Sequence, residues 1–78
     1  MFVKNKEHEM RIRDVREDRD FTQKEIAEYL HVKQNTYSQY ETGKRQIPIK
    51  DLILLARFYK TSTDYLLGLT DRIEPYDK

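Results

Sequence analysis

Residues that interrupt regular structure are scarce in this 78-residue chain, where glycine occurs only at positions 43 and 68 and proline only at 48 and 75. Helix-forming residues dominate the segments between them, and the alternation of β-branched and polar residues that marks strands is absent. A chain of this length has room for one small hydrophobic core. We therefore expect a single all-α domain.

Local start and stop signals divide the chain into five expected helices. Thr22 and Glu25 have the spacing of a capping box, in which each side chain satisfies a free backbone amide of the other residue. Ser62 is a suitable cap for the last helix, and Gly43 and Gly68 suit helix ends. The expected helices span residues 6–19, capped by Asn5, then 22–30, 34–41, 48–60 and 63–67.

Apolar residues at helical spacing give the expected buried faces of these helices. They are Ile12, Val15, Ile26, Ala27 and Leu30, followed by Ile49, Leu52, Ile53, Leu55, Ala56 and Tyr59. Tyr37 and Tyr40 are more suited to the core than to stacking on nucleic-acid bases, because they lie opposite a polar face. Outside the domain, we expect an N-terminal extension at 1–8 and a loosely ordered polar tail at 70–78.

The residues needed for several functional classes are missing. Cysteine is absent, which excludes disulfides and thiolate metal sites. His8 and His31 have no partners at metal-ligand spacing, and no nucleophile with a base or phosphate-binding loop is visible, so we expect no metal, no cofactor and no enzyme activity. Charges begin at Lys4 and no segment can span a bilayer, so we expect a soluble cytoplasmic protein without membrane contact.

Net charge alone argues against nucleic-acid binding, because 15 basic and 14 acidic residues leave a net charge of +1 and a pI near 8.0. The placement of polar groups argues for it. Two short helices joined by a tight turn allow the second to enter a DNA major groove. The outer side of that second helix offers Gln34, Asn35, Thr36, Ser38 and Gln39, flanked by Lys33, Lys44 and Arg45. Asn and Gln amides read adenine edges, and each pair contributes about 1–3 kcal/mol of discrimination.

Four spaced motifs extend this interpretation. They are Arg11-Ile12-Arg13-Asp14-Val15-Arg16, Phe21-Thr22-Gln23-Lys24-Glu25-Ile26-Ala27, Tyr40-Glu41-Thr42-Gly43-Lys44 and Asp64-Tyr65-Leu66-Leu67-Gly68. With them, residues 9–69 resemble the lambda-repressor-like, Cro-type (XRE) helix-turn-helix domain. The resemblance implies a compact five-helix fold, sequence-specific binding of double-stranded DNA by a homodimer at an inverted-repeat operator, and a role as a bacterial or phage transcriptional regulator, with repression favoured.

The resemblance also implies roles for individual residues. The base-reading positions match Gln34, Asn35 and Gln39, with Thr36 and Ser38 as further base or phosphate partners. The phosphate-contacting positions match Gln23, Lys44 and Arg45. Arg16 and Glu41 match a structural ion pair between the first and third helices, in which a guanidinium can meet a carboxylate in a bidentate manner.

The sequence departs from the family pattern at three positions. Asp20 and His31 occupy turn positions where the family favours glycine, and we expect both turns to be kept because Asp and His tolerate the left-handed region. Lys33 precedes the expected helix at 34–41, the one that would enter the major groove, and stands where the family usually has a capping Ser or Thr. Lysine cannot accept a hydrogen bond from an amide. We expect Lys33 to contact a DNA phosphate instead.

Leu54 and Phe58 add apolar surface where the family usually has charged or small residues. Three explanations remain open: a dimer interface together with Tyr65 and Leu69, a docking site for a terminal segment, or contact with another protein. The terminal segments would be Phe2 with Val3, or Ile73 with Tyr76. Contact with another protein would favour an antitoxin-like interaction module whose DNA binding is secondary.

Overall fold

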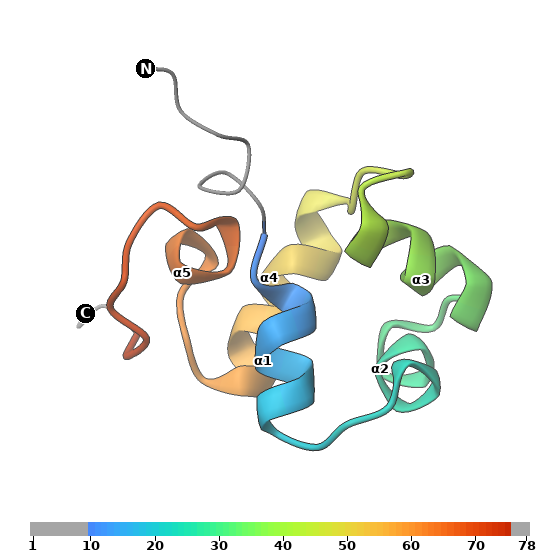
Figure 1. Ribbon diagram of the computed structural model, residues 1–78, viewed down its shortest axis with the longest axis horizontal. Helices are drawn as coiled ribbons and strands as arrows, with labels where there is room; N and C mark the ends of the chain where they lie inside the picture. Colours follow the sequence, from blue (N-terminus) through green and yellow to red (C-terminus); the bar gives the residue numbers. More distant parts are fainter. Residues whose placement is uncertain (1–9, 76–78) are drawn as a thin grey trace.

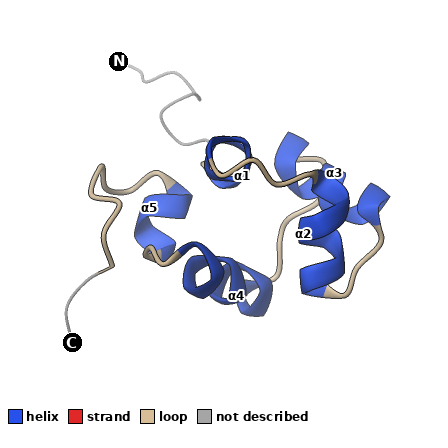
Figure 2. Ribbon diagram, turned by 90° about the horizontal axis from the view of Figure 1, so that it is seen from below, coloured by secondary structure: helices blue, strands red, loops and turns tan. Residues whose placement is uncertain are grey.

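Five helices form the part of the chain that the computed structural model describes, residues 10–75, and this part contains no strand (Figure 1). They are α1 (Ile12–Asp18), α2 (Gln23–Leu30), α3 (Gln34–Thr42), α4 (Ile49–Tyr59) and α5 (Thr63–Leu67). Figure 2 shows α2 and α3 on one side of α1 and α4, with α5 on the other side. The prediction of an all-α, five-helix fold is confirmed.

The local signals determine most of the helix ends. In the capping box of α2, Thr22 N–H donates to Glu25 Oε1 at 2.9 Å and Glu25 N–H donates to Thr22 Oγ1 at 3.0 Å. Ser62 Oγ accepts from Tyr65 N–H at 3.0 Å and so caps α5. Gly43 ends α3 in the left-handed conformation, with φ of 85°.

The start of α1 is the main error in the predicted helix boundaries. Met10 and Arg11 are not helical, so a helix from residue 6 is wrong at these two positions, and its predicted cap Asn5 lies outside the described residues. The backbone of Arg11 is instead hydrogen-bonded to α5, because its N–H donates to Leu66 O at 2.7 Å. The first turn of α1 is therefore positioned by a hydrogen bond between residues 55 positions apart in the chain. Local sequence patterns cannot reveal such a contact.

The core is built from the apolar faces of all five helices. Its buried members are Ile12, Val15, Ile26, Ala27, Leu30, Tyr37, Tyr40, Ile47, Leu52, Leu55, Ala56, Tyr59 and Leu66. The prediction that Tyr37 and Tyr40 belong to the core is confirmed, and their rings pack edge to face with centroids 6.2 Å apart. These two residues fix which side of α3 faces inward.

The buried face of α4 is narrower than predicted. Leu52, Leu55, Ala56 and Tyr59 are buried as expected. Ile49 and Ile53 were also expected inside, but they are 75% and 39% exposed, so that expectation is wrong. Helical periodicity gives the direction of an apolar stripe, whereas its width depends on how far the neighbouring helices reach around it.

Left-handed residues other than glycine make three of the turns. Asp20 and His31 have φ of 63° and 61°, which confirms that both turns keep their conformation without glycine. Lys60 has φ of 59° and ends α4, which no sequence signal indicated. There, Thr61 N–H donates to Ala56 O at 2.9 Å and Lys60 N–H donates to Arg57 O at 3.2 Å.

The segment after α5 is fastened to the domain as far as residue 73. Arg11 Nη1 donates to Thr70 O at 2.5 Å and Arg11 Nη2 donates to Asp71 Oδ1 at 2.9 Å. Thr61 Oγ1 donates to the carbonyl oxygen of Ile73. Residues 70, 71 and 73 are therefore joined to the rest of the domain by hydrogen bonds. The extension at 1–8, with Phe2, Val3 and His8, lies outside the described residues, as does Tyr76.

Candidate nucleic-acid interface

A three-residue turn joins α2 to α3. His31 N–H donates to Glu28 O at 3.1 Å and Val32 N–H donates to Ala27 O at 3.0 Å, which ends α2 in a Schellman motif. The extended Lys33 then leads directly into α3, with φ of −73° and ψ of 149°. A helix, a tight turn and a second helix in this order form a helix-turn-helix unit.

The two sides of α3 differ sharply in polarity. Tyr37 is completely buried and Tyr40 is 7% exposed, so these residues occupy the inner side. The outer side carries the predicted base-reading residues. Gln34 and Asn35 are exposed, whereas Thr36, Ser38 and Gln39 are partly exposed. The helix is thus held by its aromatic side while its amide and hydroxyl groups face away from the core.

Cationic side chains stand at both ends of α3. Lys33 is exposed at the N-cap and makes no side-chain capping bond, so the free amides of the first turn have no side-chain acceptor. Lys44 and Arg45 are exposed in the turn that follows Gly43. Their positions are suited to the phosphates that flank a base sequence read by α3.

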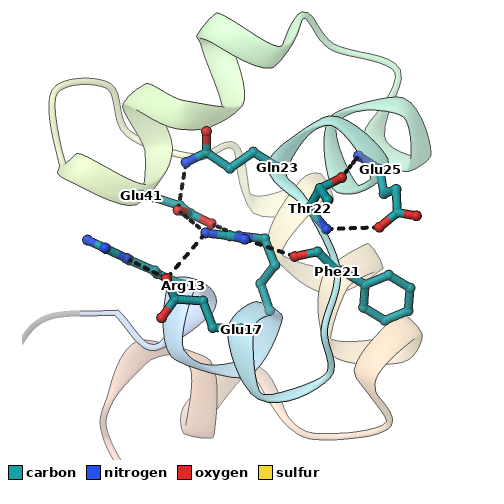
Figure 3. Close-up of polar contacts among 8 residues, drawn as sticks. Arg13, Glu17, Phe21, Thr22, Gln23, Glu25 and Glu41 are labelled. Atoms are coloured by element: carbon teal, nitrogen blue, oxygen red, sulfur yellow. Dashed lines mark hydrogen bonds and ion pairs between the residues drawn. The ribbon is translucent and has the colours of Figure 1, made fainter.

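Arg16, Gln23 and Glu41 join α1, α2 and α3 in one hydrogen-bonded network. Arg16 Nε and Nη2 donate to Glu41 Oε2 and Oε1 at 2.6 and 3.1 Å, which is the bidentate contact. Gln23 Nε2 donates to Glu41 Oε1 at 3.0 Å, and Figure 3 shows the two side chains facing each other. Arg16 Nη1 also donates to Phe21 O at 2.9 Å, next to the start of α2.

Burial and hydrogen bonding act in opposite directions on the Glu41 carboxyl. Burial opposes its ionisation, but the Arg16 guanidinium, together with the Tyr37 hydroxyl and the Gln23 amide, outweighs that effect, so the pKa of Glu41 lies below its ordinary value. The hydrogen bond to Glu41 raises the pKa of Arg16. Both groups therefore stay charged at neutral pH and hold α3 against α1.

Gln23, the predicted phosphate contact, is partly committed inside the protein. One of its two amide N–H groups is used by Glu41. Its second N–H and the backbone amides at the start of α2 are the groups left for a phosphate. The sequence did not reveal this shared use of Gln23, although its position opposite Glu41 follows once α2 and α3 are packed together.

The four residues considered for a dimer interface fall into two groups. Phe58 packs between Phe21 and Tyr29, with ring centroids 5.0 and 4.6 Å apart, and Tyr29 Oη donates to Leu54 O at 3.3 Å. The first group, Leu54 and Phe58, is therefore partly covered within the chain. The second group is at α5, where Leu69 is 68% exposed and Arg11 lies 4.4 Å from the Tyr65 ring centroid.

Residues 10–75 contain no group of three or more His, Cys, Asp or Glu side chains arranged to hold a metal ion. None of the helices in the same range is long and apolar enough to cross a membrane.

Comparison with known proteins places this geometry in context. A family model described as helix-turn-helix matches residues 12–66. The chain is 37% identical over 65 residues to the uncharacterized HTH-type transcriptional regulator YobD of Bacillus subtilis, covering 83% of this chain and 58% of that protein. It is 41% identical over 58 residues to the HTH-type transcriptional regulator ImmR of the same organism, covering 74% and 46%.

A phage protein is also similar. The cryptic phage CTXphi transcriptional repressor RstR of Vibrio cholerae is 41% identical over 49 residues, which cover 63% of this chain and 44% of that protein. The chain thus spans about half the length of the curated relatives it matches. No solved structure gives a significant match.

Proposed function

The chain belongs to the Cro-type (XRE) helix-turn-helix family, and on that premise we propose that it binds specific sequences of double-stranded DNA and regulates transcription, as a repressor. The observation that carries this proposal is the division of α3 into a buried aromatic side and an outer side of amides and hydroxyls. Such a helix is anchored firmly enough to present its polar side chains to the base edges of a major groove.

The polar residues on and beside α3 divide into two groups in the proposed complex, those that contact bases and those that contact phosphates. The amides of Gln34, Asn35 and Gln39 contact base edges, with Thr36 and Ser38 beside them as base or phosphate partners. Lys33, Lys44, Arg45 and the free N–H of Gln23 contact phosphates and fix the register of α3 on the duplex.

A homodimer is the form that would bind with useful affinity. One copy offers only three cationic side chains beside α3, namely Lys33, Lys44 and Arg45, and the 15 basic residues of the chain are nearly balanced by 14 acidic ones. Two copies would place their α3 helices in successive major grooves, about 34 Å apart, and would read an inverted repeat. Tyr65 and Leu69 favour α5 as the contact between copies, because Leu69 is 68% exposed whereas Phe58 is already packed against Phe21 and Tyr29.

The same charge balance leads us to propose weak non-specific binding. If each copy neutralises phosphates only with Lys33, Lys44 and Arg45, the logarithm of the dimer's binding constant should fall with a slope of about −5 against the logarithm of salt concentration. Specificity must then come mainly from base contacts. Acting on bacterial or phage DNA, such a regulator would work in the cytoplasm.

Gel-shift and fluorescence-polarisation binding to the promoter region of the protein's own gene tests the proposal, with a shuffled duplex of equal length as control. We expect tighter binding to the promoter duplex by about a thousandfold or more at physiological salt. Equal affinity for both duplexes would rule out sequence-specific regulation.

A further inference from the structure

Arg45 contacts Gln39 through both its backbone and its side chain. Its N–H donates to the Gln39 carbonyl oxygen at 3.2 Å, and its Nε donates to Gln39 Oε1, also at 3.2 Å. The Gln39 carbonyl belongs to the last turn of α3, where the helix itself leaves carbonyl groups without partners. Because the left-handed Gly43 turns the chain back toward α3, the backbone itself brings Arg45 to Gln39.

This contact gives the two ends of the Gln39 amide different surroundings. Oε1 is bound by Arg45, whereas no contact within the described residues uses the NH₂ group, which only donates hydrogen bonds. Gln39 follows Asn35 by four residues, so the two side chains share one face of α3. The amide therefore meets DNA as an oriented donor.

Base edges in the major groove respond differently to an oriented donor. Guanine presents two acceptors, O6 and N7, whereas adenine presents the N7 acceptor beside the N6 amino donor. A freely rotating glutamine amide can match adenine with both of its ends. When the Gln39 oxygen is bound by Arg45, the amide faces the base with its NH₂ group. Such an amide matches guanine better than adenine, because O6 and N7 of guanine are both acceptors.

We propose that Arg45 is a specificity-determining residue, which orients the Gln39 amide so that α3 prefers guanine over adenine at the base pair read by Gln39. This inference rests on the proposed function, namely sequence-specific DNA binding by α3. Nε alone makes the side-chain contact to Gln39, which leaves both Nη groups of Arg45 for a phosphate. One side chain thus links the position of the DNA backbone to the reading of a base.

The test begins with selection of binding sites from a random duplex pool by the full chain and by Gln39→Ala. The position whose base preference disappears in Gln39→Ala is the base pair that Gln39 reads. Dissociation constants are then measured for the four base pairs at that position, with wild type, Arg45→Lys, Arg45→Ala and the control Lys44→Ala. Arg45→Lys keeps the charge but has a methylene group where arginine has Nε.

Wild type should prefer guanine over adenine at this position by about tenfold or more. Arg45→Lys should reduce that preference to less than about threefold, because lysine lacks the Nε–H that contacts Gln39. Arg45→Ala should lose the preference and also bind all duplexes more weakly. Lys44→Ala should weaken all duplexes alike and keep the preference, because Lys44 makes no contact with Gln39.

The outcomes that overturn the inference are distinct from failure of the proposed function. A guanine preference that survives in both Arg45 variants shows that Arg45 does not orient Gln39, and a wild-type preference for another base overturns the stated specificity. A Gln39→Ala protein that selects the wild-type motif removes Gln39 as a reader. Only a wild-type selection without any motif would contradict sequence-specific binding itself, and the inference with it.

Discussion

Replacing Glu41 should show how strongly α3 is held on α1. The side chain of Glu41 is 2% exposed and its carboxylate meets the Arg16 guanidinium, which is 11% exposed, at 2.6 Å. Removing one partner of a buried ion pair costs about 3–5 kcal/mol, because the other charge is left uncompensated. At about 0.05–0.15 kcal/mol per residue, the whole domain is stable by about 4–12 kcal/mol. Glu41→Ala should therefore lose about a quarter or more of its stability and in the worst case fail to fold.

Glu41→Gln is the variant that allows a measurement. Glutamine keeps the shape of the side chain, but it loses the charge and turns an NH₂ group toward donors on Arg16 or Gln23. Hydrogen bonds to charged groups contribute about 1.5–3 kcal/mol each, so we expect a loss of about 2–3 kcal/mol. For a domain of this size that loss lowers the melting temperature by about 10–20 °C.

The pH dependence adds an independent check. Because the pKa of Glu41 is lowered on folding, its carboxylate stabilises the fold fully above the unfolded-state pKa, and this contribution is lost as pH falls through the folded-state pKa. The difference in melting temperature between wild type and Glu41→Gln should thus be largest near pH 7 and shrink under acid conditions.

Circular dichroism melting of wild type, Glu41→Gln and the control Glu28→Gln measures these differences. Glu28 is an exposed glutamate on α2, so its replacement should change the melting temperature by no more than a few degrees. A Glu41→Gln protein that melts within about 3 °C of wild type at pH 7 would refute the reasoning. A difference that stays constant into acid would show that the lost stability does not come from the ionised carboxylate.

Three further predictions concern single surface residues. Lys33→Ser should raise the melting temperature by about 4–8 °C through a new cap on α3 and weaken salt-dependent DNA binding, and unchanged affinity in polarisation assays would exclude the phosphate contact. Lys60→Gly should raise the melting temperature by a few degrees, because glycine adopts φ of 59° at less cost, and a lower value would contradict this. Leu69→Glu should convert the proposed dimer to a monomer in sedimentation, and a persisting Leu69→Glu dimer would exclude α5 as the interface. The control Ile49→Glu should leave the proposed dimer intact, because Ile49 lies on α4 and is 75% exposed.

Most of the fold could be predicted from the sequence, because its signals act over a few residues. Each of these signals acts within a single helix end, either through a hydrogen bond or by turning the chain, so the helix end can be predicted without tertiary information. They are the Thr22–Glu25 capping box, Ser62, Gly43 and Gly68. The start of α1 depended on Arg11 N–H reaching Leu66 O, and no local pattern encodes that contact. The left-handed Lys60 had no signal, since lysine is not typical of that conformation.

The position of single residues on the outer side of α3 could be predicted from the sequence, but the contacts between residues of the candidate site could not. Sequence spacing was enough to place Gln34 and Asn35 on the outer side of α3. That Arg45 binds the Gln39 amide depends on the path of the turn after Gly43, and that Gln23 shares Glu41 with Arg16 depends on the packing of α2 against α3. Side-chain pairs between elements follow from tertiary packing, which no periodicity describes.

The central claim is that α3 reads a DNA sequence through its outer amides. Its most direct test is the ratio of dissociation constants for a selected duplex and a shuffled one, measured at one salt concentration for wild type and for Gln34→Ala/Asn35→Ala. Wild type should bind the selected duplex about a thousandfold or more tightly, and the double variant should lose most of that ratio while its affinity for the shuffled duplex stays the same. A wild-type ratio near one, or a ratio that the double variant leaves intact, would contradict the claim.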